Sequence, residues 1–385
     1  MRRNLLLFAL ILAACDRRGP PGAELEASAP ASSATPSPTE LSSATAAMAS
    51  AGPPAPSGTS AARPPAPAPE KSPPAPAALV KGPPRPATGA HAGFRGPVDA
   101  SKDGAWLERL ASGPIAEIVR NTGGATLTLR VRFADGSRAV FKPEQKHSAS
   151  NYRAEIAAYH VDRLLGFGRT AAVVGRSIGF EHLLGHLEHS GADEKWLERF
   201  QNEVISKNGR VSGAMIAWHA GRLANAEPPK GWTAGLKSRD PVPESIAARL
   251  PEWSDLMVFD FVIDNTDRWS GGNVLSLGTG GPLIFLDNAS SFAAWRASKG
   301  ETTASLIEPI CRFRRATLDA LVAVGPAASA EHELSAELRR SLAKDPLAPV
   351  LGESQLTAVD RRIERLLQHI DQCKAALGEQ IVLLP

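Results

Sequence analysis

The stretch Val258–Phe292, VFDFVIDNTDRWSGGNVLSLGTGGPLIFLDNASSF, decides the fold expected for this 385-residue chain. Two apolar runs lie within it, Phe259–Ile263 and Leu283–Leu286. Each run ends in an aspartate, Asp264 after the first and Asp287 after the second. A short apolar run between turn residues predicts a buried strand. A carboxylate at the end of such a strand would be held in a cleft by a rigid element.

A further carboxylate, Asp267, follows the first run closely, and a Gly-rich loop and a strand connect it to Asp287. Phosphoryl transfer needs two carboxylates in such an arrangement. One orients the attacking hydroxyl, and the other holds the metal ion on the nucleotide phosphates. Either aspartate alone is also compatible with an ordinary turn or strand end, so the rest of the chain decides between the two interpretations.

Residues 1–15 predict a targeting segment, with Arg2 and Arg3 ahead of an apolar stretch, Leu5–Leu12, that is too short to span a bilayer. The segment ends in LAAC at 12–15, which resembles the lipobox of bacterial lipoproteins. The resemblance implies a signal peptide cleaved before Cys15 and a lipid anchor on that residue. We therefore expect a membrane lipoprotein of the bacterial envelope, facing the periplasm or the cell exterior. An ordinary secretory signal with an incidental Cys15 is the alternative.

Residues 16–98 predict a disordered tether. The segment is rich in Pro, Ala and Ser, holds more than half of the 32 prolines, and has no aromatic residue before Phe94. Such a composition cannot bury enough apolar surface to offset the entropy lost on ordering. We expect a semi-extended linker of polyproline II character that gives reach through the envelope.

The remaining residues, 99–385, are enough for one large or two-lobed domain. The net charge is +3 without a long basic run, so a nucleic-acid partner is not indicated. The chain has three cysteines. With Cys15 assigned to lipid, Cys311 and Cys373 remain as an even pair in an exported chain, where disulfides persist.

The first half of this domain predicts strands. Leu127–Phe133 and Ser137–Phe141 flank an Asp-Gly turn and predict a hairpin. The turn Gly123-Gly124 ahead of it would let backbone N–H groups approach phosphates, and Lys142 at the hairpin exit would supply a positive charge. A lysine in this position alone is more typical of a solvated edge.

Helices are expected elsewhere in the domain. Glu155 lies in the first turns of one of them, where a carboxylate suits the helix dipole, and His160 is interpreted as a core residue. His182, His186 and His189 lie in a polar helical insertion and are interpreted as a solvated face rather than a metal site. The expected helical segments are Trp106–Val119 (interrupted at Gly113-Pro114), Asn151–Phe167, Glu181–Asn208, Ala304–Val324, Glu331–Leu342 and Gln355–Leu377.

The chain resembles the secretory-pathway kinases that include the Golgi casein kinase and the glycosaminoglycan xylosylkinase. The resemblance runs from about Asn121 to Cys373, and the order and approximate spacing of several short motifs hold. These motifs are AVFKP at 139–143, AEIAAYH at 154–160 with DR at 162–163, VGR at 174–176, FDF at 259–261 with Asn265 and DR at 267–268, LDN at 286–288, CR at 311–312 with Arg314, APVL at 348–351, and DRR at 360–362 with Cys373.

The resemblance implies an α+β, atypical two-lobed protein-kinase-like fold, with a strand-rich N-lobe and a helical C-lobe after the tether. It also implies ATP as a substrate, together with Mn²⁺ or Mg²⁺. The expected activity is phosphoryl transfer to a hydroxyl of an extracytoplasmic protein (Ser/Thr) or glycan. Which of these is the acceptor does not follow from the sequence.

The resemblance also implies roles for single residues. Lys142 would contact the ATP phosphates beside Gly123 and Gly124, and Glu155 would pair with Lys142 or bind the metal ion. Asp267 would be the catalytic base and Asp287 a metal ligand. Cys311 and Cys373 match family cysteines, which implies a disulfide between two C-terminal helices.

One departure from the family keeps an alternative open. After Asp267-Arg268 the family has two histidines, a tyrosine and a glutamate, whereas this chain has Trp269–Gly272 followed by Asn273. Asn273 would be a second metal ligand at a spacing one residue longer than in ordinary kinases. The altered loop, together with the scarcity of ATP outside the cytoplasm, favours the alternative of a catalytically inactive pseudokinase lipoprotein that acts as a nucleotide- or partner-binding module.

Overall fold

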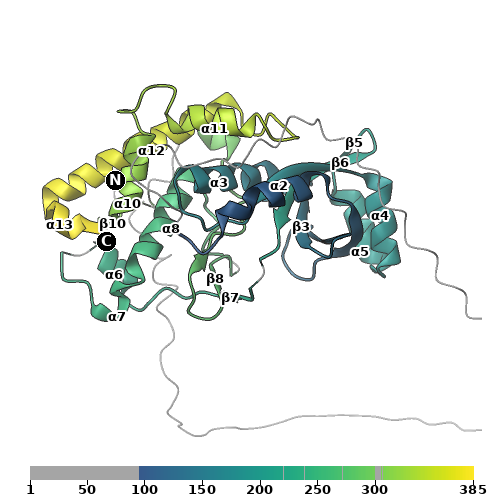
Figure 1. Ribbon diagram of the computed structural model, residues 1–385, viewed down its shortest axis with the longest axis horizontal. Helices are drawn as coiled ribbons and strands as arrows, with labels where there is room; N and C mark the ends of the chain where they lie inside the picture. Colours follow the sequence, from purple (N-terminus) through teal and green to yellow (C-terminus); the bar gives the residue numbers. More distant parts are fainter. Residues whose placement is uncertain (1–94, 220, 238, 271, 300–304, 306) are drawn as a thin grey trace, which may run out of the picture. The chain divides into compact units, whose positions relative to one another are not determined.

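The computed structural model describes residues 95–385, apart from 220, 238, 271, 300–304 and 306 (Figure 1). The predicted signal peptide, the lipidation site Cys15 and the tether up to residue 94 lie outside the described residues. Arg95, at the end of the predicted tether, contacts the domain, because its guanidinium donates to the Leu165 carbonyl (3.0 Å) and to Thr317 Oγ1 (3.2 Å). No helix within the described residues is long and apolar enough to cross a membrane.

The N-lobe is built on an antiparallel sheet with the order β1-β2-β3-β6-β4, and β5 pairs with β6. Alternate residues of β2 are buried, as the apolar alternation of that segment predicts. The strands are β1 (Ile115–Arg120), β2 (Leu129–Phe133), β3 (Arg138–Pro143), β4 (Val173–Gly179), β5 (Ser206–Lys207) and β6 (Arg210–Ala217).

Helix α3 (Tyr152–Leu164) lies at the junction of the two lobes, because it packs against β4 and β6 as well as against α8 (Leu250–Ile263) and α11 (Leu334–Leu342). The Asn151 side chain caps its first turn by accepting from the Arg153 N–H at 3.1 Å. The other N-lobe helices are η1 (Ala100–Lys102), α2 (Asp103–Ser112), α4 (Phe180–His189) and α5 (Glu194–Glu203).

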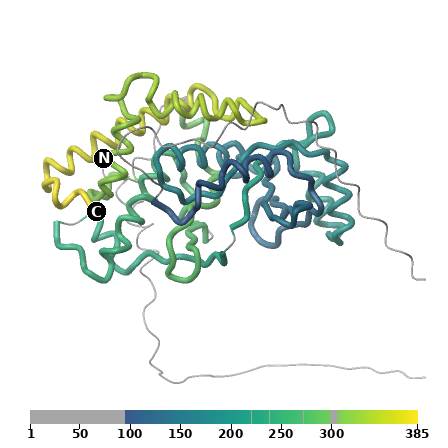
Figure 2. Tube along the Cα trace, in the orientation of Figure 1, coloured from purple at the N-terminus to yellow at the C-terminus, as the bar shows by residue number. Residues whose placement is uncertain are grey.

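The C-lobe is mainly helical and surrounds α8, all of whose residues are buried. Figure 2 follows the chain from the strand-rich part (blue) to the helical part, where the C-terminal segment is yellow. The remaining elements are α6 (Trp232–Lys237), α7 (Glu244–Ala247), α9 (Ala294–Lys299), α10 (Arg315–Ala323), α12 (Glu353–Leu377) and α13 (Glu379–Val382), an antiparallel sheet of β7 (Leu223–Asn225), β8 (Leu275–Leu277) and β9 (Leu283–Ile284), and a parallel pair of β10 (Phe313–Arg314) and β11 (Leu383–Leu384).

The predicted fold class is confirmed, but two of the predicted elements are wrong. Phe259–Ile263 is the last part of α8 rather than a strand. Because α8 is buried on all sides, its sequence carries no 3.6-residue periodicity, and a short apolar run then looks like a strand. Ile115–Val119 is part of β1 rather than of a helix. Gly113-Pro114 ends α2, and the β-branched residues beyond it pair with β2.

Two further expectations are corrected in detail. The predicted helix Ala304–Val324 begins only at Arg315, so Cys311 lies in the segment ahead of β10 and not in a helix. His186 is 4% exposed, and its Nε2 lies 3.2 Å from Nε2 of His182. The histidine face of α4 is therefore partly buried in the lobe rather than fully solvated.

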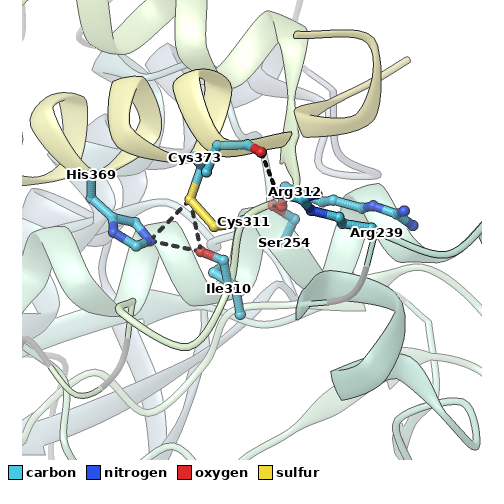
Figure 3. Close-up of a disulfide and its surroundings, with 8 residues drawn as sticks. Arg239, Ser254, Ile310, Cys311, Arg312, His369 and Cys373 are labelled. Carbon is cyan, nitrogen blue, oxygen red and sulfur yellow. Dashed lines mark hydrogen bonds between the residues drawn. A yellow bond between two sulfur atoms is a disulfide. The ribbon is translucent and has the colours of Figure 1, made fainter. Parts of the chain in front are cut away.

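The predicted disulfide is present between Cys311 and Cys373, with a Cα–Cα distance of 5.3 Å (Figure 3). It joins the segment ahead of β10 to α12. His369 lies beside it and contacts the Ile310 carbonyl through Nε2 at 2.7 Å. Since both sulfurs are in a disulfide, this Cys-Cys-His cluster offers no thiolate to a metal ion.

We expect the disulfide to stabilise the domain through the unfolded state. The two cysteines are separated by 62 positions. The loop-entropy model gives about 4 kcal/mol for a loop of this size. The double variant Cys311→Ser/Cys373→Ser should therefore lower the free energy of unfolding in urea by about 4 kcal/mol. Dithiothreitol should destabilise the wild type by a similar amount and leave the double variant unchanged. An equal response of both proteins to the reductant would contradict this.

His160 is a core residue, as predicted, with 7% of its surface exposed. Burial, followed by the positive charges of Arg163 and Lys344, lowers the pKa of His160 from 6.5 to about 3. The unfolded chain therefore binds a proton below pH 6.5 that the folded chain does not bind until about pH 3. Stability that is fully present above pH 6.5 is lost as the pH falls through this window.

We expect this histidine to make the domain sensitive to mild acid. Between pH 7.5 and 5, the wild type should lose about 2 kcal/mol more unfolding free energy than the variant His160→Leu, because one proton costs about 1.4 kcal/mol per pH unit. Urea unfolding of both proteins at the two pH values measures this. The other histidines are common to both proteins and cancel in the difference. Parallel losses in the two proteins would show that His160 is protonated in the folded state.

Candidate active site

Lys142 connects three segments that are far apart in the sequence. It lies near the end of β3, and its Nζ is 2.5 Å from Glu155 Oε1 in α3 and 2.6 Å from Asp287 Oδ1 after β9. The Lys142 and Glu155 side chains are 12% and 3% exposed, whereas that of Asp287 is 51% exposed. The structure thus brings together three of the predicted site residues, and the group opens to solvent on the Asp287 side.

The charges of this group are mutually stabilised. Burial alone would lower the pKa of Lys142, but the carboxylates of Glu155 and Asp287 raise it above its usual value. Burial would raise the pKa of Asp287, whereas the Lys142 ammonium holds it below its usual range. At neutral pH, an ammonium group therefore lies between two carboxylates. This arrangement suits the recognition of a phosphate together with a cation.

Glu155 also holds the loop that carries Asp287. Its Oε1 accepts the Asn288 backbone N–H at 3.1 Å in addition to the Lys142 ammonium. Because Glu155 lies in the first turn of α3, the helix dipole favours its negative charge. Glu155 thus links the Lys142 ammonium to the backbone of the segment that carries Asp287.

Asp267 lies in the segment that directly follows the end of α8. The helix stops at Asp264, which adopts a left-handed conformation (φ 59°) and pairs through its carboxylate with Arg296 Nε at 2.7 Å. Asn265 then accepts the Asp267 N–H with its side chain at 3.1 Å. Asp264 therefore has a structural role at the helix end. Asp267, three residues further on, is the half-buried carboxylate beyond the helix.

Two serines that the sequence analysis did not single out contact the Asp267 carboxylate. Ser270 Oγ donates a hydrogen bond to Oδ1, and Ser290 Oγ lies 3.4 Å from Oδ2. The Asp-x-x-Ser spacing of a turn is the sequence signal that would have identified Ser270. These contacts show that the carboxylate accepts hydroxyl donors in this position.

Arg268 is a further residue without a predicted role, although it is part of the matched Asp-Arg motif. Its guanidinium is 1% exposed and pairs with Asp260 Oδ1 of α8 at 2.9 Å. It also donates to Asn288 Oδ1 at 2.7 Å and to the Leu286 carbonyl. Arg268 therefore ties the segment that carries Asp267 to the segment that carries Asp287.

Asn273 lies beside Asp267 and is hydrogen-bonded to it. Its amide Nδ2 donates to the Asp267 carbonyl at 3.0 Å, which closes the loop after Arg268. Within the described part of the chain, no hydrogen bond joins Asn273 to Asp287. The predicted role of Asn273 as a metal ligand thus stays a prediction, and the contact that is present is one that shapes the loop.

Gly123 and Gly124 lie in the exposed loop between β1 and β2, and both have a positive φ, 104° and 84°. Glycine adopts this conformation without strain. The loop is anchored because Gln145 bonds both backbone groups of Leu127, and Arg199 Nη2 donates to the Ala125 carbonyl at 2.6 Å. In the described residues the two glycines make no contact with Lys142, and their role in ATP binding stays a prediction.

The donor set fits a hard divalent cation. Mg²⁺ and Mn²⁺ prefer oxygen ligands, and the carboxylates of Glu155 and Asp287 converge on the single ammonium group of Lys142. These two residues are therefore the ones that would hold such an ion. Such an ion would supply positive charge that neutralises the phosphates of a nucleotide.

Comparison with known proteins identifies relatives of the whole domain. The model of the family described as Golgi casein kinase, C-terminal, Fam20 matches residues 98–201 and 219–382. Pseudokinase FAM20A of Mus musculus is 30% identical over 319 residues, which cover 70% of this chain and 58% of that protein. Glycosaminoglycan xylosylkinase of Homo sapiens is 26% identical over 331 residues, which cover 75% and 79%. The chain thus spans little more than half of the FAM20A relative and most of the xylosylkinase.

Solved structures agree with this at the level of the fold. The Golgi casein kinase with Mn and ADP bound matches with a TM-score of 0.61 at 21% identity, over 74% of this chain and 79% of that one. A hydra Fam20 with sugar matches with a TM-score of 0.56 at 24% identity, over 72% and 90%. The predicted kinase-like architecture is confirmed by both, and the chain belongs to the Fam20 family of the Golgi casein kinase.

Proposed function

We propose that this chain is a kinase that transfers the γ-phosphoryl group of ATP to a hydroxyl of an extracytoplasmic protein or glycan. The observation that carries this proposal is the convergence of Glu155 and Asp287 on Lys142. Phosphoryl transfer depends on positioning and on charge neutralisation, and a lysine between two carboxylates provides both.

The residues have separate tasks in this proposal. Lys142 contacts the phosphates of ATP, and Glu155 fixes its ammonium group from the buried side. Asp287, which is the exposed partner of Lys142, would hold Mn²⁺ or Mg²⁺ together with Glu155. The ion neutralises charge on the phosphates when it is bound.

Asp267 orients the acceptor. The hydroxyls of Ser270 and Ser290 already contact its carboxylate, which supports a position where an O–H donor is accepted. An acceptor hydroxyl in the same place is turned toward the γ-phosphorus and transfers its proton to Asp267. Asn265 Oδ1 accepts the Asp267 N–H and Asn273 Nδ2 donates to the Asp267 carbonyl, so the backbone that carries this carboxylate is held during the step.

The family includes relatives named for each acceptor class, an extracellular serine/threonine protein kinase and a glycosaminoglycan xylosylkinase.

We propose that the acceptor meets the domain outside the cytoplasm. The lipobox-like LAAC at 12–15 and the Pro-rich segment 16–98 support a domain tethered through Cys15 to a bacterial envelope membrane.

A second candidate is a pseudokinase that binds nucleotide or a partner without phosphoryl transfer. The replacement of the family loop by Trp269–Gly272 favours it, as does the similarity to a protein named a pseudokinase. Against it stands the retention of all four charged residues, Lys142, Glu155, Asp267 and Asp287.

Metal-dependent turnover of ATP distinguishes the two candidates. The full-length protein in detergent should transfer labelled phosphate to a library of proteins and glycans in the presence of Mn²⁺. Asp267→Asn should lower kcat by about 10²- to 10⁴-fold, because it removes the group that takes the hydroxyl proton. Asp287→Asn should abolish turnover. The matched control is Asp371→Asn, at an aspartate of α12 whose side chain is 75% exposed, and it should leave turnover unchanged.

The result that overturns the kinase is specific. Nucleotide binding that is lost in Lys142→Met, without transfer to any acceptor by the wild type, would establish the pseudokinase instead. Turnover that is equal in the wild type and Asp267→Asn would reject Asp267 as the base.

Replacement of Arg268 should lower both the free energy of unfolding and the rate of phosphoryl transfer. The variant Arg268→Ala leaves the buried Asp260 without its charged partner, so the free energy of unfolding should fall by about 3–5 kcal/mol. Adding Asp260→Ala should restore part of this loss, because no unpaired buried charge remains. Transfer should stay low in the double variant, since the link to Asn288 is still missing. Full recovery of activity in the double variant would contradict the positioning role.

A further inference from the structure

Cys311, His369 and Cys373 form a compact cluster around the disulfide (Figure 3). Their ligand atoms, the two Sγ atoms and one imidazole nitrogen, all lie within 4.8 Å of one another. His369 and Cys373 are four positions apart in α12, so their side chains share one face of that helix. Cys311 meets them from the segment ahead of β10. Two thiolates and an imidazole are the ligands of a Cys₂His metal site, which this cluster would offer once its sulfurs are reduced.

The spacing of two of these ligands matches tetrahedral coordination. Zn²⁺ binds a thiolate at about 2.3 Å and an imidazole nitrogen at about 2.0–2.1 Å. At the tetrahedral angle, these bond lengths place the sulfur and the nitrogen about 3.6 Å apart. Nε2 of His369 lies 3.6 Å from Sγ of Cys373. Helix α12 therefore already holds two ligands at the required distance, and only the Cys311 sulfur has to move away when the bond to Cys373 is broken.

The backbone that carries Cys311 has other anchors besides the disulfide. The Cys311 N–H donates to the Leu236 carbonyl of α6 at 2.8 Å. The next residue, Arg312, donates from Nη1 to the Gly235 carbonyl at 3.1 Å, and its own carbonyl accepts from Ser254 Oγ of α8 at 2.8 Å. These bonds keep Cys311 opposite α12 after reduction, so a metal ion would meet ligands that are already in place.

His369 is placed to assist the opening of the disulfide. Its Nε2 lies 2.7 Å from the Ile310 carbonyl, which can only accept a hydrogen bond, so Nε2 carries a proton in this state. Cys311 is partly exposed, whereas Cys373 is 2% exposed. A thiolate from solvent therefore reaches the Cys311 sulfur. The Cys373 thiolate that departs lies beside the His369 N–H, which stabilises its negative charge.

We propose that reduction converts this disulfide into a Zn²⁺ site, with the Cys311 and Cys373 thiolates and His369 Nε2 as its ligands. The segment ahead of β10 then stays linked to α12 in both redox states. This inference goes beyond the proposed phosphoryl transfer and does not depend on it. Sulfur and imidazole ligands favour Zn²⁺, whereas Mg²⁺ and Mn²⁺ prefer oxygen. The cluster is therefore suited to a different metal from the one that Glu155 and Asp287 would hold.

The conversion is balanced with a dithiol as the reductant. One thiolate of the dithiol bonds to Cys311 Sγ, the protein disulfide breaks, and its electron pair passes to Cys373 Sγ. The second thiolate of the reductant displaces the Cys311 thiolate, and the reductant leaves as a disulfide. Zn²⁺ then binds both protein thiolates in place of their protons. His369 stays neutral because its proton moves from Nε2 to Nδ1, and water fills the fourth position.

The link between these segments matters for the helix that precedes the proposed base. Helix α12 holds α8 through Arg362, whose Nε donates to the Val262 carbonyl at 2.8 Å. The Cys311 segment holds α8 from the other direction through Ser254 and Arg312. A disulfide or a zinc ion closes this ring of contacts around α8. Reduction without zinc opens the ring.

The test uses the full-length protein in detergent, without a polyhistidine tag. It is reduced with dithiothreitol, treated with EDTA and freed of both by gel filtration in the absence of oxygen. Co²⁺ is the probe, because it absorbs light in a tetrahedral site that also accepts Zn²⁺. One Co²⁺ per chain should give the charge-transfer band of cobalt–thiolate bonds, and Zn²⁺ should remove it. The oxidised protein should give no band. His369→Ala should weaken Co²⁺ binding by at least about tenfold.

Two variants serve as controls. The double variant Cys311→Ser/Cys373→Ser keeps Cys15 and every histidine, and it should give no charge-transfer band. His332→Ala, at a histidine whose side chain is 52% exposed, should bind Co²⁺ as the wild type does. In the reduced wild type, Zn²⁺ should also protect Cys311 and Cys373 from alkylation by iodoacetamide, which the masses of their peptides measure.

Several results would overturn the site. A band of equal strength in the double cysteine variant would assign the metal to other residues. The absence of a band in reduced wild type that is folded by circular dichroism would reject the site, and an unchanged affinity in His369→Ala would remove the imidazole from the ligand set. If the metal-free reduced protein unfolds, Zn²⁺ present during reduction should preserve the fold of the wild type better than that of His369→Ala. Equal unfolding of the two proteins would reject the proposal.

Discussion

The buried guanidinium of Arg268 is the interaction on which the candidate site depends. Arginine presents its donors in a rigid planar fork, so one side chain can bond several segments at fixed angles. Here it bonds Asp260 in α8, the Leu286 carbonyl and the Asn288 side chain. Asp267 precedes Arg268 and Asp287 lies between Leu286 and Asn288. The two carboxylates are therefore held relative to each other by one charged group that solvent does not reach.

The N-lobe joins this arrangement through Lys142 and Glu155. Burial of either charged side chain without a partner would be unfavourable, because each charge would lose its hydration. Together with Asp287 they form a charged group that spans β3, α3 and the segment after β9. The lobes thus meet where opposite charges compensate each other. The same charges are the ones a nucleotide and its cation would engage, which couples the packing of the lobes to the chemistry proposed for them.

The sequence predicted the parts of this site that lie at the ends of regular elements. Lys142 lies near the end of β3, Asp287 follows β9, and Glu155 lies in the first turn of α3, so local patterns and the family motifs agree on them. The apolar run Phe259–Ile263 was misinterpreted, because a helix buried on every side has no polar face to reveal its period. The contacts of Arg268 and Ser270 could not be derived either, since they join residues that only the tertiary fold brings together.

The loop Trp269–Gly272 gains a different meaning from its surroundings. The loop differs from the family motif at these positions, and this difference alone argues against catalysis. In the fold, its tryptophan is ordered by Trp232 and Trp253 from two other helices. The replaced loop is therefore a packed part of the C-lobe, and Lys142, Glu155 and Asp287 still contact one another beside it in the fold.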